Sequence, residues 1–105
     1  MSANKKAIRQ AFRDSVFKRD NHRCRVCSDQ NSPLDAHHIT DRNEMPNGGY
    51  VKENGISLCP PCHEKAEAYH SSGKTSHVDG YHPLDLYRKI GSSEEIARRA
   101  SQRLG

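Results

Sequence analysis

The chain lacks tryptophan and long apolar runs. Of its 105 residues, only 32% are hydrophobic and 6% are aromatic, and uninterrupted apolar runs do not exceed two or three residues. This excludes a membrane span of about 20 apolar residues and the apolar stretch of a secretory signal. We therefore expect one cytoplasmic domain whose thin core needs additional stabilisation.

Cysteine is scarce, and its four copies form two Cys-x-x-Cys pairs. Cys24 is paired with Cys27, and Cys59 with Cys62, with 31 residues between the pairs. In a reducing compartment disulfides do not persist, whereas four thiolates can bind a tetrahedral Zn²⁺ at about 2.3 Å. A redox-active dithiol or four buried free cysteines are the alternatives, but neither explains the paired arrangement. We predict a structural zinc site.

Positive charge is concentrated near the N-terminus. Residues 5–25 contain eight Lys or Arg residues and two Asp residues, and apolar residues there recur at spacings of three and four, as in an amphipathic helix. We predict a helix over residues 4–19 with its basic face outward. Arg9 and Arg13 are the candidate contacts to nucleic-acid phosphates. A merely solvated helix surface is the alternative.

The remaining sequence alternates short apolar stretches with turn residues, which is typical of a small α+β domain. Met-Pro-Asn-Gly-Gly in residues 45–49 excludes a helix there, and Pro60 and Pro61 suit only the first turn of one. In chain order we predict a strand over 34–40, a non-helical loop over 41–49, one or two strands within 50–58, a helix over 61–69, a loop over 70–82 and helical turns over 84–90.

The last segment carries a helix-start signal. Ser92 and Glu95 form a Ser-x-x-Glu capping box. The residues that follow have helical spacing and predict the buried stripe of a short helix: Ile96, Ala97, Ala100 and Leu104.

Groups suited to metal and proton chemistry lie between and just after the cysteine pairs. His37, His38 and Asn54 lie between them, and His63 follows the last cysteine. Neutral imidazole binds divalent cations, and with an ordinary pKa of about 6.5 it also accepts a proton from water. In a strand, His37 and His38 would point to opposite faces, so that one could hold a metal while the other faces a substrate.

Three further residues have weaker signals. Glu67 and His70 lie four and seven residues beyond His63 on one helical face, and either could complete a metal site. Arg42 is a candidate phosphate clamp, with a solvated loop arginine as the equal alternative. Asn54-Gly55 is also a turn dipeptide, so Asn54 has a backbone explanation as well as a functional one.

At these residues the sequence resembles the HNH endonuclease family, also described as the ββα-metal fold, over about residues 19–67. The resemblance rests on Arg19-Asp20 before Cys24-x-x-Cys27, on Asp35-Ala-His37-His38-Ile39, on Gly48-Gly49, and on Asn54-x4-Cys59-x-x-Cys62-His63. It implies a ββα-metal core of the zinc-binding subtype, flanked by N- and C-terminal helices. The single HNH domain, residues 1–105, would divide into a basic helix (1–19), a zinc-stapled core (20–70) and a loop with C-terminal helices (71–105).

The resemblance also implies residue roles. His38 would be the general base, and His37 and His63 would bind one catalytic divalent metal: Mg²⁺, Mn²⁺, Ni²⁺ or Zn²⁺. His37 stands where the family often has Asp, which bears on the preferred metal. Asn54 would be the second catalytic residue, which braces the loop and the base and in some members of the family approaches the metal.

The expected function is hydrolysis of DNA phosphodiester bonds by an endonuclease or nickase. DNA is the expected partner, with no membrane, and the chain would work alone or within a larger nucleoprotein or phage-type machinery, in an oligomeric state that stays open. The alternatives are a non-catalytic zinc-stabilised module that binds nucleic acid and a zinc domain that binds proteins.

Overall fold

The computed structural model describes residues 5–104; Gly105 and residues 1–4, which begin the predicted N-terminal helix segment, lie outside the described residues. Within the described range there are four α-helices and one two-stranded antiparallel sheet, which confirms the predicted small α+β class. The elements are α1 (Lys5–Arg19), β1 (Asp35–His38), β2 (Gly55–Leu58), α2 (Pro60–Ser71), α3 (Pro83–Lys89) and α4 (Glu94–Gln102). None of these helices is long and apolar enough to cross a membrane.

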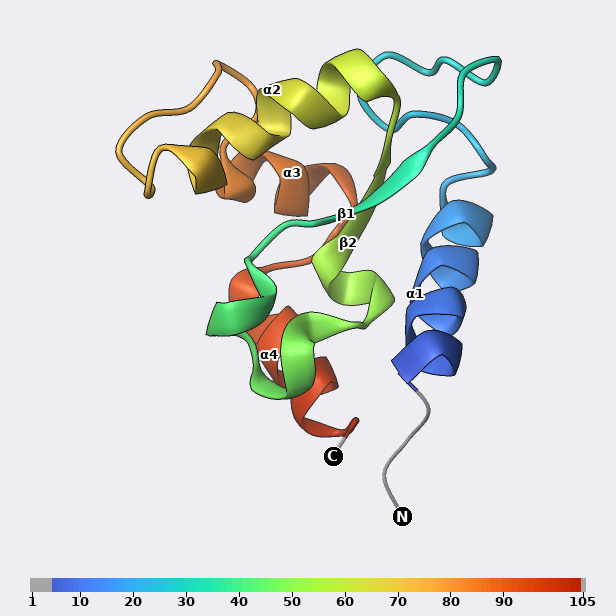
Figure 1. Ribbon diagram of the computed structural model, residues 1–105, viewed down its shortest axis with the longest axis vertical. Helices are drawn as coiled ribbons and strands as arrows, with labels where there is room; N and C mark the ends of the chain where they lie inside the picture. The colour runs from blue at the N-terminus through green and yellow to red at the C-terminus, as the bar shows by residue number, and fades with distance from the viewer. Residues whose placement is uncertain (1–4, 105) are drawn as a thin grey trace.

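The hairpin of β1 and β2 lies between the helices, with α1 on one side and α2 and α3 on the other (Figure 1). Its register sets His37 opposite Ile56 and His38 opposite Gly55. Side chains alternate along a strand, and the contacts follow that rule: Asp35 and His37 meet His63 of α2, whereas His38 stacks on Phe12 of α1. Adjacent histidines therefore serve opposite faces of the hairpin.

Helix α1 forms where the apolar spacing predicted it. Phe12 and Val16, one turn apart, are its buried residues. They pack closely on the hairpin because Gly55 has no side chain: a Cβ there would lie 2.5 Å from Val16 Cγ2 and 2.7 Å from Phe12 Cε1. The glycine sets the distance between α1 and β2.

A buried carboxylate ties the end of α1 to β2. Asp20 is 3% exposed, and its Oδ2 accepts hydrogen bonds from the Ser57 amide and from Arg19 Nη2, both at 2.9 Å. Arg19 Nη2 also donates to the Gly55 carbonyl at 2.7 Å. The Arg19-Asp20 pair that precedes the first cysteine is thus a structural clamp between helix and hairpin.

The apolar core lies on the other side of the hairpin. Ile39, Ile56 and Leu58 are fully buried with Leu86 and Tyr87 of α3. Three of the four cysteines are buried in the same cluster. The core is therefore continuous with the cysteine site.

The prediction that residues 41–49 contain no helix is wrong. Arg42–Glu44 and Pro46–Gly49 form short 3₁₀ turns, the first of them capped by the Asp41 side chain, which accepts from the Asn43 amide. The positive φ angles of Asn47 and Gly48 break the second turn.

The second strand is also shorter than the pattern suggested. A further 3₁₀ turn, Lys52–Asn54, precedes it. Residues 50 and 51 therefore lie outside β2, which begins at Gly55.

The predicted buried stripe of the last helix is wrong at two positions: Ile96 is 46% and Leu104 44% exposed. The buried residues of α4 are the small ones, Ala97, Ala100 and Ser101, which let the helix pack closely on the Pro46–Gly49 turn.

The cap of α4 is displaced by one residue from the predicted box. Ser93 caps the helix by accepting from the Ile96 amide. Ser92 instead donates to the Glu53 carbonyl at 2.9 Å, which ties this chain segment to the turn before β2.

We expect Asp20→Ala to lower the free energy of unfolding by about 3 kcal/mol, because it leaves the buried Ser57 amide without its acceptor and removes the carboxylate that pairs with Arg19. Urea denaturation measures the change. Asp14→Ala is the control, because Asp14 is exposed and, among the described residues, its side chain accepts a hydrogen bond from Gln10 alone. The loss in this variant is expected to stay below about 1 kcal/mol. Equal losses would contradict the assignment of Asp20 as a clamp.

Candidate functional site

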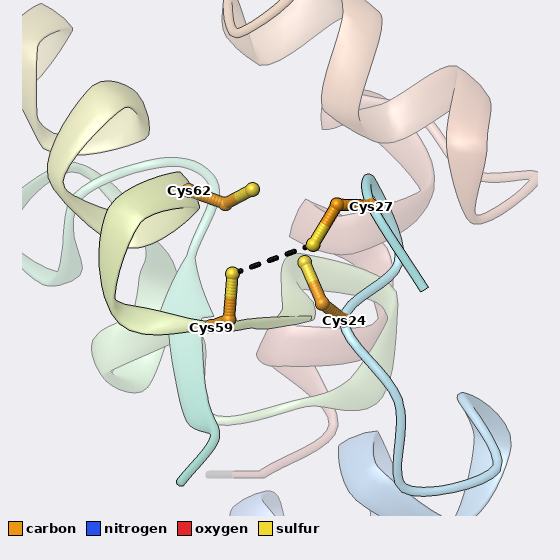
Figure 2. A group of neighbouring side chains, drawn as sticks. All are labelled: Cys24, Cys27, Cys59 and Cys62. Carbon is orange, nitrogen blue, oxygen red and sulfur yellow. Dashed lines mark hydrogen bonds between the residues drawn. The ribbon is translucent and has the colours of Figure 1, made fainter. Parts of the chain in front are cut away.

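The four cysteines meet at one point (Figure 2). Cys24 and Cys27 come from the loop after α1, and Cys59 and Cys62 from the start of α2. Their sulfur atoms all lie within 4.8 Å of one another, and those of Cys27 and Cys59 are 3.5 Å apart. Four thiolates at zinc distance in a tetrahedron are about 3.8 Å apart, and no disulfide joins any of the four. The donor set and its spacing fit a structural zinc site.

The surroundings of Cys24 favour the thiolate that zinc binds, whereas burial raises the pKa of Cys59 and Cys62. Burial would raise the pKa of Cys24, but hydrogen bonds from the backbone, those of Cys27 and Cys59 foremost, outweigh it and lower the pKa to about 7. Cys62 accepts a hydrogen bond from the Tyr81 hydroxyl at 3.2 Å. Tyr81, which the sequence did not single out, thus joins the 72–82 loop to the cysteine site, as outer hydrogen bonds do around metal ligands.

A second group of ligand atoms lies on the α2 face of the hairpin. His37, His63 and Glu67 each offer an atom within 4.8 Å of the others. Glu67 Oε1 lies 3.5 Å from both His37 Nδ1 and His63 Nε2. The structure therefore brings together the two predicted ligands and adds Glu67, one of the two residues that could complete the set.

His37 is the informative member of this group. It is 2% exposed, and neither ring nitrogen has a hydrogen-bond partner among the described residues. Burial lowers the pKa of His37, so its ring is neutral at neutral pH. Contact with His37 lowers the pKa of Glu67 to about 2, so the carboxylate is ionised. A buried unpaired imidazole is costly unless something binds it, and a divalent metal fits this donor set.

Asp35 orients His63, a contact that the sequence analysis does not predict. Its Oδ2 lies 3.1 Å from His63 Nδ1. When Nδ1 carries the proton and donates it to Asp35, Nε2 keeps a free lone pair on the side of Glu67. In this way the Asp35 carboxylate fixes the tautomer of a metal-binding histidine. The signal was present: Asp35 precedes His37 by two residues, so both share one face of the strand.

His70 does not join the ligand group. Its Nε2 lies 3.2 Å from the His38 carbonyl, to which it donates. His70 therefore fixes the end of β1 and with it the backbone of His38.

His38 lies on the opposite face, between two aromatic rings. It stacks on Phe12 at 4.5 Å between centroids and meets the edge of Tyr50 at 4.9 Å. Burial, followed by the electrostatic influence of the neighbouring His37 and Arg42, lowers the pKa of His38 to about 4. The ring is therefore neutral at neutral pH and able to accept a proton, and its pKa lies well below the ordinary value assumed from sequence.

Asn54 holds the loop that follows β1. Its side chain is completely buried and makes four hydrogen bonds. Oδ1 accepts from the Thr40 amide at 3.0 Å and the Tyr87 hydroxyl at 2.7 Å, and Nδ2 donates to the carbonyls of Thr40 (3.0 Å) and Gly49 (3.2 Å). The geometry is that of a brace. The hydrogen bond from Tyr87 comes from α3, and no local sequence pattern predicts it.

The three predicted nucleic-acid contacts line one side of the site. Arg9, Arg13 and Arg42 surround a cavity of about 350 Å³ that reaches His38. Arg42 also lines the neighbouring cavity of about 320 Å³ that contains His37 and the metal-ligand group. The basic face of α1 and the two histidines thus border one continuous surface.

Comparison with known proteins bears on the segment that holds both ligand groups. Residues 24–68 match the family model described as HNH endonuclease. The match spans both cysteine pairs, the hairpin and most of α2, and it confirms the predicted resemblance there. It supports a nuclease-type function and DNA as the general class of partner. Neither the curated proteins nor the solved structures compared with the chain include a match.

We expect the purified protein to contain at least one zinc ion per chain, and Cys59→Ser to lose the zinc of the cysteine site and melt more than about 10 °C lower, because the metal supplies folding free energy to a thin core. Elemental analysis and thermal unfolding measure the two effects. Gln30→Ser, an exposed position in the loop that carries Cys27, is the control and should retain zinc. A folded wild type without zinc would contradict the assignment.

We expect Tyr87→Phe to lower the free energy of unfolding by about 1–2 kcal/mol, since Asn54 and Thr40 lose a buried hydrogen-bond partner. The matched control is Tyr69→Phe, because the Tyr69 hydroxyl makes no hydrogen bond among the described residues and is only partly buried. Denaturant unfolding compares the two. The brace is refuted if both substitutions cost the same.

Proposed function

We propose that the chain is a single-domain, metal-dependent HNH endonuclease that hydrolyses DNA phosphodiester bonds. His38 is the general base, and His37, His63 and Glu67 hold one catalytic divalent metal. The observation that carries the proposal is the buried His37, whose ring nitrogens have no hydrogen-bond partner among the described residues. Two further ligand atoms lie beside it, and His38 lines the same cavity.

Each ligand residue has a distinct part in the proposed metal site. His37 offers a neutral ring, His63 offers Nε2 because Asp35 engages Nδ1, and Glu67 adds a negative charge. When bound, a divalent metal neutralises charge on the phosphate and stabilises the leaving oxygen. Because the set contains two imidazoles and one carboxylate, Mn²⁺, Ni²⁺ and Zn²⁺ suit it as well as Mg²⁺.

In the proposed reaction His38 takes a proton from water. The water oxygen bonds to phosphorus as the bond to the 3′ oxygen breaks, and solvent protonates the leaving oxygen. Nε2 of His38 is buried and unpaired among the described residues, so Nδ1 is the nitrogen that meets water. A positioned base of this kind contributes about 10²–10⁴ in rate.

The remaining predicted residues support binding and position. Arg9, Arg13 and Arg42 would neutralise phosphates along the strand that enters the cavity. The side-chain hydrogen bonds of Asn54 go to the loop after β1 and to α3. None of them reaches a proposed metal ligand or His38. We therefore assign Asn54 as a positioning residue that acts through residues 40–49.

The test is nicking of supercoiled plasmid across a series of Mg²⁺, Mn²⁺, Ni²⁺ and Zn²⁺ concentrations. We expect His38→Ala to lower the nicking rate at least about 100-fold at every metal concentration, because it removes the proton acceptor and leaves the ligands in place. We expect His37→Ala to raise the metal concentration for half-maximal rate at least about tenfold, with activity regained at high metal and in His37→Asp.

His77→Ala is the control, an exposed histidine in the 72–82 loop, away from both cavities. Calorimetric metal titration of each variant checks that His38→Ala still binds metal. Full activity in His38→Ala would refute the mechanism. DNA binding without nicking at any metal would instead favour the non-catalytic nucleic-acid-binding module.

A further inference from the structure

A larger cavity, of about 500 Å³, lies beside the proposed active site between α1, the 42–50 loop and the chain after α4. Three cations line it, Lys5, Arg9 and Arg42, together with the side chains of Ile8, Tyr50 and Leu104. None of the described residues that line it is acidic. Its volume lies in the range of pockets that hold small organic groups.

The cations of this cavity are available to an anion. Arg42 Nη1 donates to the Tyr50 hydroxyl at 3.1 Å. Burial would raise the pKa of Tyr50, but the hydrogen bond from Arg42 and the proximity of Arg9 outweigh it and lower the pKa. Within residues 5–104, neither arginine forms an ion pair with a carboxylate. Arg9 and Arg42 line the cavity together with Tyr50, and two guanidinium groups on one cavity wall form a site for a phosphate.

The cavity also has an apolar wall, which a site for phosphate alone does not need. Leu104 is 44% exposed and Ile8 is partly exposed. The face of Tyr50 is kept open by Gly48, where a Cβ would lie 2.7 Å from Tyr50 Cε2 and where φ is +84°. Cations beside an aromatic ring and aliphatic side chains suit a ligand with a flat apolar face next to a phosphate.

A nucleotide has both features, but only an unpaired one can offer them together. In a continuous duplex the base faces are stacked inside the helix, and a protein meets phosphates, sugars and base edges. In a single strand or gap the base is free to stack on aromatic and aliphatic side chains while its phosphate meets arginine. The lining therefore matches an unpaired nucleotide better than a paired one.

We propose that this cavity binds an unpaired nucleotide of the DNA substrate, so that the chain prefers single-stranded or gapped DNA to continuous duplex. The inference rests on the proposed nuclease function and names its substrate class. Arg42 lines both this cavity and the one that contains His37 and His63. The bound nucleotide therefore lies next to the phosphate presented to His38.

The test is fluorescence anisotropy with one labelled DNA sequence in three forms: single-stranded, fully duplex, and duplex with a short single-stranded gap. Salt is held constant and no divalent metal is added, so that binding is measured apart from cleavage. We expect the gapped and single-stranded forms to bind at least about tenfold more tightly than the duplex. Equal or tighter binding of the duplex would overturn the proposal.

Variants locate the preference in the cavity. Leu104→Ser should weaken binding of gapped DNA about tenfold and leave duplex binding unchanged, because it removes apolar contact with the base. Ile8→Ser is the second variant and should act in the same direction. Ile96→Ser is the matched control, since Ile96 on α4 is 46% exposed and lies outside the cavity lining. Equal loss for gapped and duplex DNA in Leu104→Ser would overturn the proposal.

The two proposals fail separately. Retained preference for gapped DNA in a protein that cleaves no DNA at any metal would refute the nuclease mechanism and support the nucleotide cavity. Metal-dependent nicking in a protein that prefers duplex DNA would refute the cavity assignment and leave the nuclease mechanism in place.

Discussion

Side chains leave β1 alternately toward α2 and toward α1, because Asp35–His38 pair antiparallel with Gly55–Leu58. Asp35 and His37 thereby meet His63 and Glu67 on one face, and His38 enters the aromatic contact with α1 on the other. A shift of the register by one residue would exchange the faces. The division between proposed metal ligands and proposed base is thus a property of strand geometry, and the site depends on whatever fixes the register.

A two-stranded hairpin does not fix its own register in water, since it is marginally stable alone. Here it is held from three directions. The cysteine cluster joins the loop after α1 to the end of β2, Asp20 accepts from the Ser57 amide, and Asn54 binds the backbone on both sides of the loop. Of these, only the cysteine site can contribute on the scale that a chain with 32% hydrophobic residues requires. The zinc assignment and the catalytic assignment are therefore physically coupled.

Local sequence patterns predicted much of this arrangement, whereas contacts between residues far apart in the sequence were not predicted. The spacing of the cysteines, the apolar period of α1 and the prolines that start α2 are local, and each led to the observed element. Helical spacing placed Ile96, Ala97, Ala100 and Leu104 on one buried stripe. The structure buries Ala97 and Ala100 as predicted, but close packing adds the small Ser101 and leaves Ile96 and Leu104 exposed. Partners separated by about thirty residues or more, such as Tyr87 for Asn54, have no signature in one sequence.

Gly55 shows how a single residue connects the sequence, the packing of α1 and the chemistry of His38. From sequence it belonged to a turn dipeptide, whereas in the fold it is the point where α1 rests on β2, with Phe12 and Val16 occupying the space of a side chain. That approach brings Phe12 onto His38, and burial there keeps the histidine neutral. Because Arg9 and Arg13 flank Phe12 on the same helix, the contact that desolvates the proposed base also sets the cations at the edge of its cavity. The proposed binding of a phosphate strand and the proposed role of His38 as base therefore both depend on the packing of α1 against Gly55.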